Sequence, residues 1–174
     1  GVHVATTIHG GDGNDVLAGS TGNDTITGDN GNDLLSGAGG NDHLSGGIGN
    51  DAYYYELGDG SDTITETSGT DSIHFGAGIA FADLALSVSG NDVLISVGGQ
   101  IITVQNHFAA DLSGRVESIV FDDGSTFDLS TYGLNDVPVA NDDNATGDED
   151  TIITGNVLTN DTDEDGDTLT VTAA

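Results

Sequence analysis

The chain has 174 residues and sets 30 acidic side chains against one basic side chain, Arg115, for a formal net charge of -29 at pH 7. Such a surface repels nucleic acid and anionic membranes, so neither is expected as a partner. Cysteine is absent, which excludes disulfides, thiolate metal sites and cysteine nucleophiles. No apolar run is long enough to span a membrane and the first residues lack a signal-peptide pattern, so we expect no direct membrane insertion.

Residues 10–51 repeat with a period of nine. Glycines recur at this interval, an aspartate follows each glycine by two residues, and one large apolar residue follows each aspartate by two more. One apolar residue in nine is too sparse for an amphipathic helix. A short strand followed by a glycine turn fits the spacing, and two repeats then make one coil. Stacked coils are expected to bury a column of Leu and Ile side chains.

The same spacing continues beyond residue 51. The stretch "YYYELGDGSDTI" inserts two residues, after which Asp62 and Asp71 again follow a glycine by two positions. At the other end, Ile8 keeps the apolar position while Thr6 stands where an aspartate is expected. We therefore predict a solenoid over residues 1–75.

The repeat unit resembles the Gly-Gly-x-Gly-x-Asp-x-apolar-x pattern of the RTX, or repeats-in-toxin, family. "GGDGNDVLA" is a complete match, and "GSTGNDTIT", "GDNGNDLLS", "GAGGNDHLS" and "GGIGNDAYY" follow it in register. The resemblance covers residues 10–54. It implies an all-β fold, a parallel β-roll, with calcium bound in the turns.

The carboxylates themselves also call for a cation. In a two-repeat coil, turns of equal parity lie on the same side, so Asp15 is expected to face Asp33, Asp24 to face Asp42, and Asp33 to face Asp51. At a coil spacing of about 4.8 Å, two such charges repel by roughly 1 kcal/mol in water and by several kcal/mol at an effective dielectric constant of about 20. Calcium takes about six to eight oxygen ligands and tolerates irregular geometry better than magnesium does. We predict several calcium ions, three from these pairs and two more if the register continues past the insertion.

The predicted metal site combines the aspartates with the turn glycines. Its members are Asp15, Asp24, Asp33, Asp42, Asp51, Asp62 and Asp71, with Gly10, Gly11, Gly13, Gly19, Gly22, Gly28, Gly31, Gly37, Gly40, Gly46 and Gly49. The alternative interpretation is that Asn-Asp-Gly clusters are ordinary turn formers with solvated carboxylates.

The segment 76–135 is predicted to be an antiparallel β-rich cap. "LALSVSGNDVLISVGGQIITVQ" alternates apolar and polar residues around Gly-Asn and Gly-Gly, and "VESIVFDDGSTFDLS" has two strand-like arms around Asp123-Gly124. A solenoid end exposes open strand edges, which this segment is expected to cover. It also resembles, more loosely than the repeats do, the segment that follows such repeats in RTX proteins.

Residues 136–174 are acidic, contain the only proline, and resemble the opening of the cadherin-like, immunoglobulin-type repeats of large bacterial adhesins, with "VPVANDD" and "NVLTNDTDEDGDTLTV" in order. This is too short for a seven-stranded sandwich, so a linker and a truncated domain start are expected. Asp161, Asp163 and Asp165 match the start of a calcium loop, but Thr172 replaces its final Glu, which argues against an EF-hand. Calcium at Asp142, Asp143 or within 161–167 and a merely solvated loop both remain open.

No catalytic motif is visible. The histidines are scattered and lack a zinc-binding spacing, and we expect the chain not to be an enzyme. The pattern favours a calcium-dependent folding and rigidifying module of a large, type I-secreted bacterial surface protein or adhesin. It would stay unfolded at low cytosolic calcium and fold outside a Gram-negative cell, next to neighbouring domains of a longer chain. The alternatives are a secretion appendix of an extracellular protease, lipase or epimerase, and a module that binds host or surface glycan.

Overall fold

The structure is a computed structural model, and it describes residues 3–110, 114–133, 141, 158, 160 and 161. The chain divides into two compact units, Gly1–Tyr132 and Gly133–Ala174. Most of the predicted tail segment lies outside the described residues, including its acidic loop from Thr162 on. Within that second unit, the backbone N–H of Asn141 donates to Oδ1 of Asp161 at 2.8 Å.

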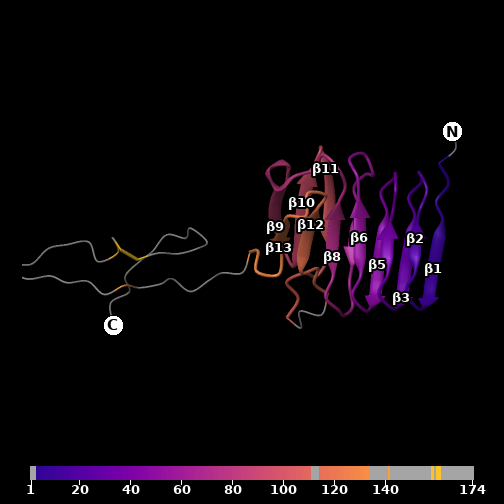
Figure 1. Cartoon of the computed structure of the whole chain (residues 1–174), viewed down its shortest axis with the longest axis horizontal. Coiled ribbons are helices and arrows are strands. Elements are labelled where there is room, and N and C mark those ends of the chain that lie inside the picture. Colours follow the sequence, from indigo (N-terminus) through magenta and orange to yellow (C-terminus); the bar gives the residue numbers. More distant parts are fainter. Residues whose placement is uncertain (1–2, 111–113, 134–140, 142–157, 159, 162–174) are drawn as a thin grey trace, which may run out of the picture. The chain divides into compact units, whose positions relative to one another are not determined.

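The first unit is built on a roll of two parallel sheets. Its strands alternate between the sheets along the chain: β1 (Thr7–Asp12), β3 (Thr25–Asn30), β5 (His43–Ile48) and β7 (Thr63–Thr65) form one, and β2 (Val16–Ala18), β4 (Leu34–Ser36), β6 (Ala52–Tyr55) and β8 (Ser72–Phe75) the other. Figure 1 shows these coils side by side, starting from β1 at the N-terminal end. The predicted all-β parallel roll is confirmed.

Each coil contains two repeats. Ile8 pairs with Ile26 and Ile26 with Leu44, so the offset between neighbouring strands is 18 residues. After the insertion Leu44 pairs with Ile64, an offset of 20. The two additional residues are absorbed in the turn that follows β6, where the N–H of Asp59 donates to the carbonyl of Glu56 at 3.2 Å. The nine-residue register therefore resumes after the insertion.

The apolar residues of the repeats form one column between the two sheets. Ile26, Leu35, Leu44, Tyr53, Ile64 and Ile73 are each at most 2% exposed. Full burial of such an aliphatic side chain is worth about 1.5–3 kcal/mol. Toward the C-terminal end the column widens into aromatic rings, where Tyr55 contacts Phe75 edge-on at 5.6 Å and Phe75 stacks on Phe121 at 5.9 Å.

The cap continues both sheets instead of lying over them. The cap begins with a 3-10 turn at Phe81–Asp83. A meander of β9 (Ala85–Ser89), β10 (Asp92–Val97) and β11 (Gln100–Val104) then joins one sheet. A hairpin of β12 (Ser118–Phe121) and β13 (Thr126–Asp128) joins the other. Val104 of β11 pairs in parallel with Ile64, and Ile119 of β12 pairs in parallel with Ile73. The predicted hairpins are confirmed, and the strand edges of β7 and β8 are paired by backbone hydrogen bonds.

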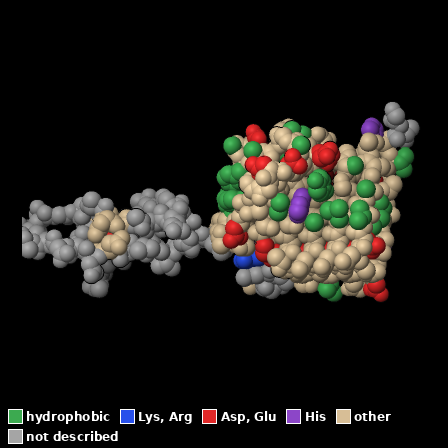
Figure 2. Space-filling model, in the orientation of Figure 1, with side chains coloured by type: hydrophobic (Ala, Val, Ile, Leu, Met, Phe, Trp, Pro, Cys, Tyr) green, Lys and Arg blue, Asp and Glu red, His purple; other side chains and the backbone are tan. Residues whose placement is uncertain are grey.

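No helix in the described part of the chain is long and apolar enough to cross a membrane. Figure 2 shows hydrophobic side chains spread over the visible face of the stacked strands, with acidic side chains in scattered groups. Many carboxylates do not reach the surface because they point into the turns.

Candidate metal centre

The turns between the sheets stack in two columns. Column A contains the turns that lead into β2, β4, β6 and β8; column B contains those that lead into β3, β5 and β7. Successive turns are in van der Waals contact along each column. A Cβ on Gly31 would collide with the carbonyl oxygen of Gly13, and a Cβ on Gly49 with that of Gly31. Both glycines have φ of +139°, a left-handed conformation that L side chains disfavour, so only glycine fits on both counts.

Column A carries a ladder of aspartates. The backbone N–H of Asp15 donates to Oδ1 of Asp33 at 2.8 Å, that of Asp33 to Asp51 at 2.7 Å, and that of Asp51 to Asp71 at 2.8 Å. Each carboxylate thus reaches back to the preceding coil with one oxygen. The predicted facing pairs of this column lie together, including the pair on either side of the insertion.

Column B repeats this arrangement. The N–H of Asp24 donates to Oδ1 of Asp42 at 2.7 Å, and that of Asp42 to Asp62 at 3.0 Å. The ladder begins at Thr6, whose N–H donates to Oδ1 of Asp24 at 2.6 Å. Thr6 therefore occupies the position of an aspartate in the first turn without adding a charge.

The ladder bonds use one oxygen of each carboxylate and leave the second oxygen of most of them without a hydrogen-bond partner. Among the described residues, the Oδ2 atoms of Asp15, Asp33, Asp42, Asp51 and Asp71 are buried without a hydrogen-bond partner. A buried carboxylate oxygen without a partner is costly, because folding removes the water that solvated it. Loss of that water raises the pKa of Asp42 and of Asp51, and it raises the pKa of Asp71 to about 7. Protons or cations beside these oxygens would therefore stabilise the closed stack.

Main-chain carbonyls converge on the same small spaces. A Cβ built on Gly10 would lie 2.7 Å from both Oδ2 of Asp15 and the carbonyl oxygen of Gly28. A Cβ on Gly28 would collide with Oδ2 of Asp33 and the carbonyl of Gly46 in the same way. Carboxylate and carbonyl oxygens from successive coils thus surround a space that glycine keeps clear. All of these are hard oxygen donors, the ligands that calcium prefers, and the residues present fit calcium.

The predicted glycines fall into three groups. The first glycine of each repeat lies against the carboxylate of its own turn; these are Gly10, Gly19, Gly28, Gly37 and Gly46. A second group lies against a carbonyl of the preceding coil and consists of Gly22, Gly31, Gly40 and Gly49. The last two, Gly11 and Gly13, have no neighbour that a Cβ would meet, but their φ angles are +98° and +119°. Every predicted glycine therefore has a steric or conformational reason to be glycine. The first group is the one that touches the candidate ion space.

The turn of Asp24 differs from the others. Ser20 replaces the second glycine of the repeat, and its backbone N–H donates to Oδ2 of Asp24 at 2.6 Å, while its hydroxyl lies 3.2 Å from the same atom. The bond from the Ser20 N–H is the main reason that the pKa of Asp24 is lowered. This carboxylate is stabilised in its charged form even without a cation.

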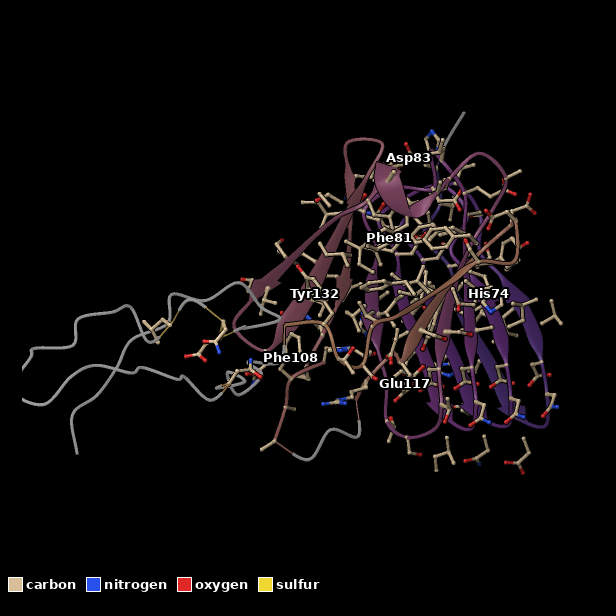
Figure 3. All side chains as sticks on the ribbon, turned by 60° about the vertical axis from the view of Figure 1, so that its left-hand side comes forward. His74, Phe81, Asp83, Phe108, Glu117 and Tyr132 are labelled. Carbon is tan, nitrogen blue, oxygen red and sulfur yellow. The ribbon has the colours of Figure 1, made fainter. Side chains whose placement is uncertain are left out.

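Sequence reasoning missed two parts of the site. The asparagines before the aspartates of the first five repeats form a second ladder in the opposite direction. The N–H of Asn32 donates to Oδ1 of Asn14, and that of Asn50 to Oδ1 of Asn32, both at 2.9 Å. Glu117 of the cap then extends column A, because its Oε2 accepts from the N–H of Asp71 at 2.6 Å. Figure 3 shows Glu117 at the level of the turns.

The histidines do not gather into a site in the described part of the chain. There, the side chains that lie close enough together to share a metal ion are the carboxylates of Asp51, Glu66 and Asp71, and no histidine is among them. His74 stacks on Tyr54 with ring centroids 6.1 Å apart, and His107 is fully buried with its Nε2 3.1 Å from the carbonyl oxygen of Leu129. Both therefore take part in packing.

Family profiles match consecutive parts of the chain. The RTX calcium-binding nonapeptide repeat (4 copies) matches residues 9–44, 18–53 and 27–64. Residues 9–64 are RTX repeats. The match covers the ladder aspartates from Asp15 to Asp62, and Asp71 lies beyond it. RTX repeats bind calcium, and proteins that contain them are typically secreted.

Two further profiles match beyond the RTX repeats. The haemolysin-type calcium binding protein related domain matches residues 83–131, which include β9 to β13, and a bacterial Ig domain matches residues 135–174. Among solved structures, the chain is similar to the AlgE6R3 subunit of the mannuronan C5-epimerase from Azotobacter vinelandii, with 26% identity, coverage of 81% of this chain and 93% of that one, and a TM-score of 0.32. No curated protein sequence matched significantly.

Proposed function

We propose that this chain is a calcium-dependent folding and rigidifying module of a large, secreted bacterial surface protein, and that it is not itself an enzyme. At low cytosolic calcium the RTX repeats stay unfolded and exportable through a type I channel. In the calcium-rich medium outside a Gram-negative cell they close into the roll. The ion acts as a folding partner rather than as a catalyst.

The observation that carries this proposal is the row of buried, unpartnered Oδ2 atoms along the two ladders. Without cations, carboxylates at coil spacing repel one another and lose their water on closure. A calcium ion between turns replaces both the water and the missing countercharge. Because a complete site needs two successive coils, binding and folding are expected to occur together.

The match of residues 135–174 to a bacterial Ig domain supports placement in a multidomain adhesin-type protein. In such a chain a calcium-filled RTX roll forms a stiff spacer between domains. Neighbouring domains of the same chain are then its structural partners.

The test is a calcium titration of the purified chain, followed by far-ultraviolet circular dichroism, with magnesium at the same concentrations as the control. A cooperative gain of β-sheet signal with calcium and not with magnesium is expected. A full β-sheet spectrum in excess chelator would contradict the proposal, since the roll would then close without ions.

Glycan binding is a second candidate function, supported by one exposed aromatic pair. Tyr54 is 41% exposed and stacks on His74 on the outward face of β6 and β8. An exposed ring edge with polar neighbours is suited to contact with a sugar. Chemical-shift changes confined to these two side chains on addition of soluble oligosaccharides would support the role, and unchanged spectra would remove it.

A further inference from the structure

The last turn of column A departs from the repeat. The earlier turns of this column have glycine at the first position, at Gly10, Gly28 and Gly46, but here it is Glu66. The spaces beside Gly10 and Gly28, in the earlier turns of this column, are bounded by a carboxylate oxygen and a main-chain carbonyl. The space beside Gly46 is bounded instead by Oδ2 of Asp51 and Oε1 of Glu66. A side-chain carboxylate thus stands where the other turns have a neutral carbonyl.

Three carboxylates meet at this point. Asp51, Glu66 and Asp71 each offer one ligand oxygen, and these three oxygens lie within 4.8 Å of one another. Asp51 and Asp71 are each only 1% exposed, and the Oδ2 atom of each has no hydrogen-bond partner. The cluster is therefore not a solvated acidic patch, because two of its members are fully buried with an unused ligand atom.

Glu66 is held in place by Tyr53, one of the inward residues of the core column. Tyr53 stands where Leu or Ile is found in the preceding coils, and its hydroxyl donates to Oε1 of Glu66. The same hydroxyl accepts from the backbone N–H of Gly46 at 2.6 Å, and Oε2 of Glu66 accepts from the N–H of Thr67 at 3.1 Å. The carboxylate is thus held beside the site by a hydrogen bond to each of its two oxygens.

We propose that Asp51, Glu66 and Asp71 form a three-carboxylate cation site that binds calcium more tightly than the other turns of the roll. The inference rests on the proposed calcium-dependent function and adds to it a ligand, Glu66, and a rank order among the sites. Calcium affinity rises with the number of charged ligands in a rigid site. One additional negative charge therefore sets this site apart from those that use two aspartates and carbonyls.

The site also joins the roll to the cap. Asp71 donates its N–H to Glu117, and the strand that starts after Asp71 is β8, which pairs with β12. An ion held by Asp71 therefore fixes the coil on which the cap is assembled. The tightest site lies where the repeats meet the cap.

The test uses the full chain and two probes, calcium by calorimetry and terbium by luminescence excited through tyrosine. The chain has no tryptophan, and Tyr53 directly contacts Glu66, so terbium in this site is expected to give sensitised emission at the first equivalent. Glu66→Gln and Glu66→Gly are expected to weaken the tightest binding step by on the order of 10- to 100-fold. Glu66→Gly introduces the residue that the earlier turns of this column have at the same position, so the turn is expected to fold with it.

Glu56→Gln is the matched control, because Glu56 is an exposed glutamate ten residues away. It should leave the tightest step unchanged. Circular dichroism at saturating calcium verifies that each variant is folded. Glu66 variants that fold in calcium and retain the wild-type tightest step would overturn the three-carboxylate site while leaving the proposed function intact. A wild-type chain that takes up neither ion would overturn both.

Discussion

Replacing Asp42 by Asn is expected to change the stability of the roll in opposite directions with and without calcium. Asp42 is 3% exposed, its Oδ1 accepts from the N–H of Asp24, and its Oδ2 has no partner. Asn keeps an oxygen for the ladder bond and nearly the same volume. It removes the charge and one ligand oxygen.

The magnitude follows from the ladder geometry. Asp42 lies between Asp24 and Asp62, one coil away on each side. At about 4.8 Å and an effective dielectric constant of about 20, each such pair repels by roughly 3 kcal/mol, against about 1 kcal/mol in bulk water. Without calcium, Asp42→Asn should therefore stabilise the roll by at least about 1 kcal/mol. With calcium it should destabilise the roll by on the order of 2 kcal/mol, through a 10- to 100-fold loss of affinity at the sites that use Asp42.

The assay is thermal unfolding of wild type and variant in millimolar calcium. In excess chelator, where the wild-type roll is expected to be unfolded, the β-sheet circular dichroism signal of the two chains is compared instead. For a unit of this size, 1 kcal/mol shifts the Tm by about 3–6 °C. Asp12→Asn is the control, since Asp12 is exposed and its Oδ1 accepts only from the side chain of Asn30. An unchanged Tm of Asp42→Asn in calcium, with no more β-sheet signal than wild type in chelator, would refute the argument, because it would mean that the carboxylate serves only as a hydrogen-bond acceptor.

Three further predictions concern the glycine spaces, the acidic groups and the core. Gly28→Ala should weaken calcium binding at least about 10-fold by calorimetry, because its Cβ enters a candidate ion space. Gly39→Ala is the control, since its Cβ would make only ordinary contacts from 3.8 Å, and it should leave the affinity unchanged. Equal effects of the two substitutions would contradict the prediction. Burial raises the pKa of Glu66 to about 8 and that of Asp71 to about 7, above unfolded values near 4. The calcium-free fold therefore binds more protons between about pH 4 and 8, its stability falls as pH rises through that window, and β-sheet signal in chelator should grow from pH 8 to pH 5; a flat profile would count against it. Leu35→Ala, at a fully buried position, should cost about 2–5 kcal/mol in calcium by denaturant unfolding, and a cost below about 1 kcal/mol would contradict the single-column core.

The stacked part of the fold was predictable because it is encoded locally and repeatedly. The spacing from Gly13 to Asp15 to Leu17 recurs every nine residues, and each recurrence specifies a turn, a carboxylate and one inward side chain. Once two repeats make a coil, aspartates 18 residues apart must face each other in neighbouring coils. The insertion before Asp62 did not disturb this, because a turn on the outside of a stack absorbs extra residues without shifting the strands.

The junction with the cap was not predictable in this way. The parallel pairing of β11 with β7 and of β12 with β8 joins residues that are 40 and 46 positions apart, and no period connects them. A weak local signal existed at Glu117-Ser118-Ile119, which repeats Asp71-Ser72-Ile73 with a longer acid. The sequence did not indicate that Glu66 is a ligand, because a glutamate in place of the repeat's first glycine suggests that the repeat pattern has ended. Its role depends on contacts from Tyr53 and Asp51 that only the folded chain brings together.

We expect the two ends of the roll to differ in how much they depend on ions. At the N-terminal end Ile8 and Leu17 are only partly buried, and the first turn carries Thr6 where the others carry a charge. At the other end the column is fully buried and both sheets continue into the cap. In a stack where each coil contacts only its neighbours, stability is a sum of coil and interface contributions. Each ladder aspartate contacts the coil before it, so an ion bound at one turn lowers the repulsion met by the next coil. We therefore expect closure to spread from the capped end, where the core column is fully buried, toward the N-terminal coils, where bound ions are expected to contribute more to the stability of the turns.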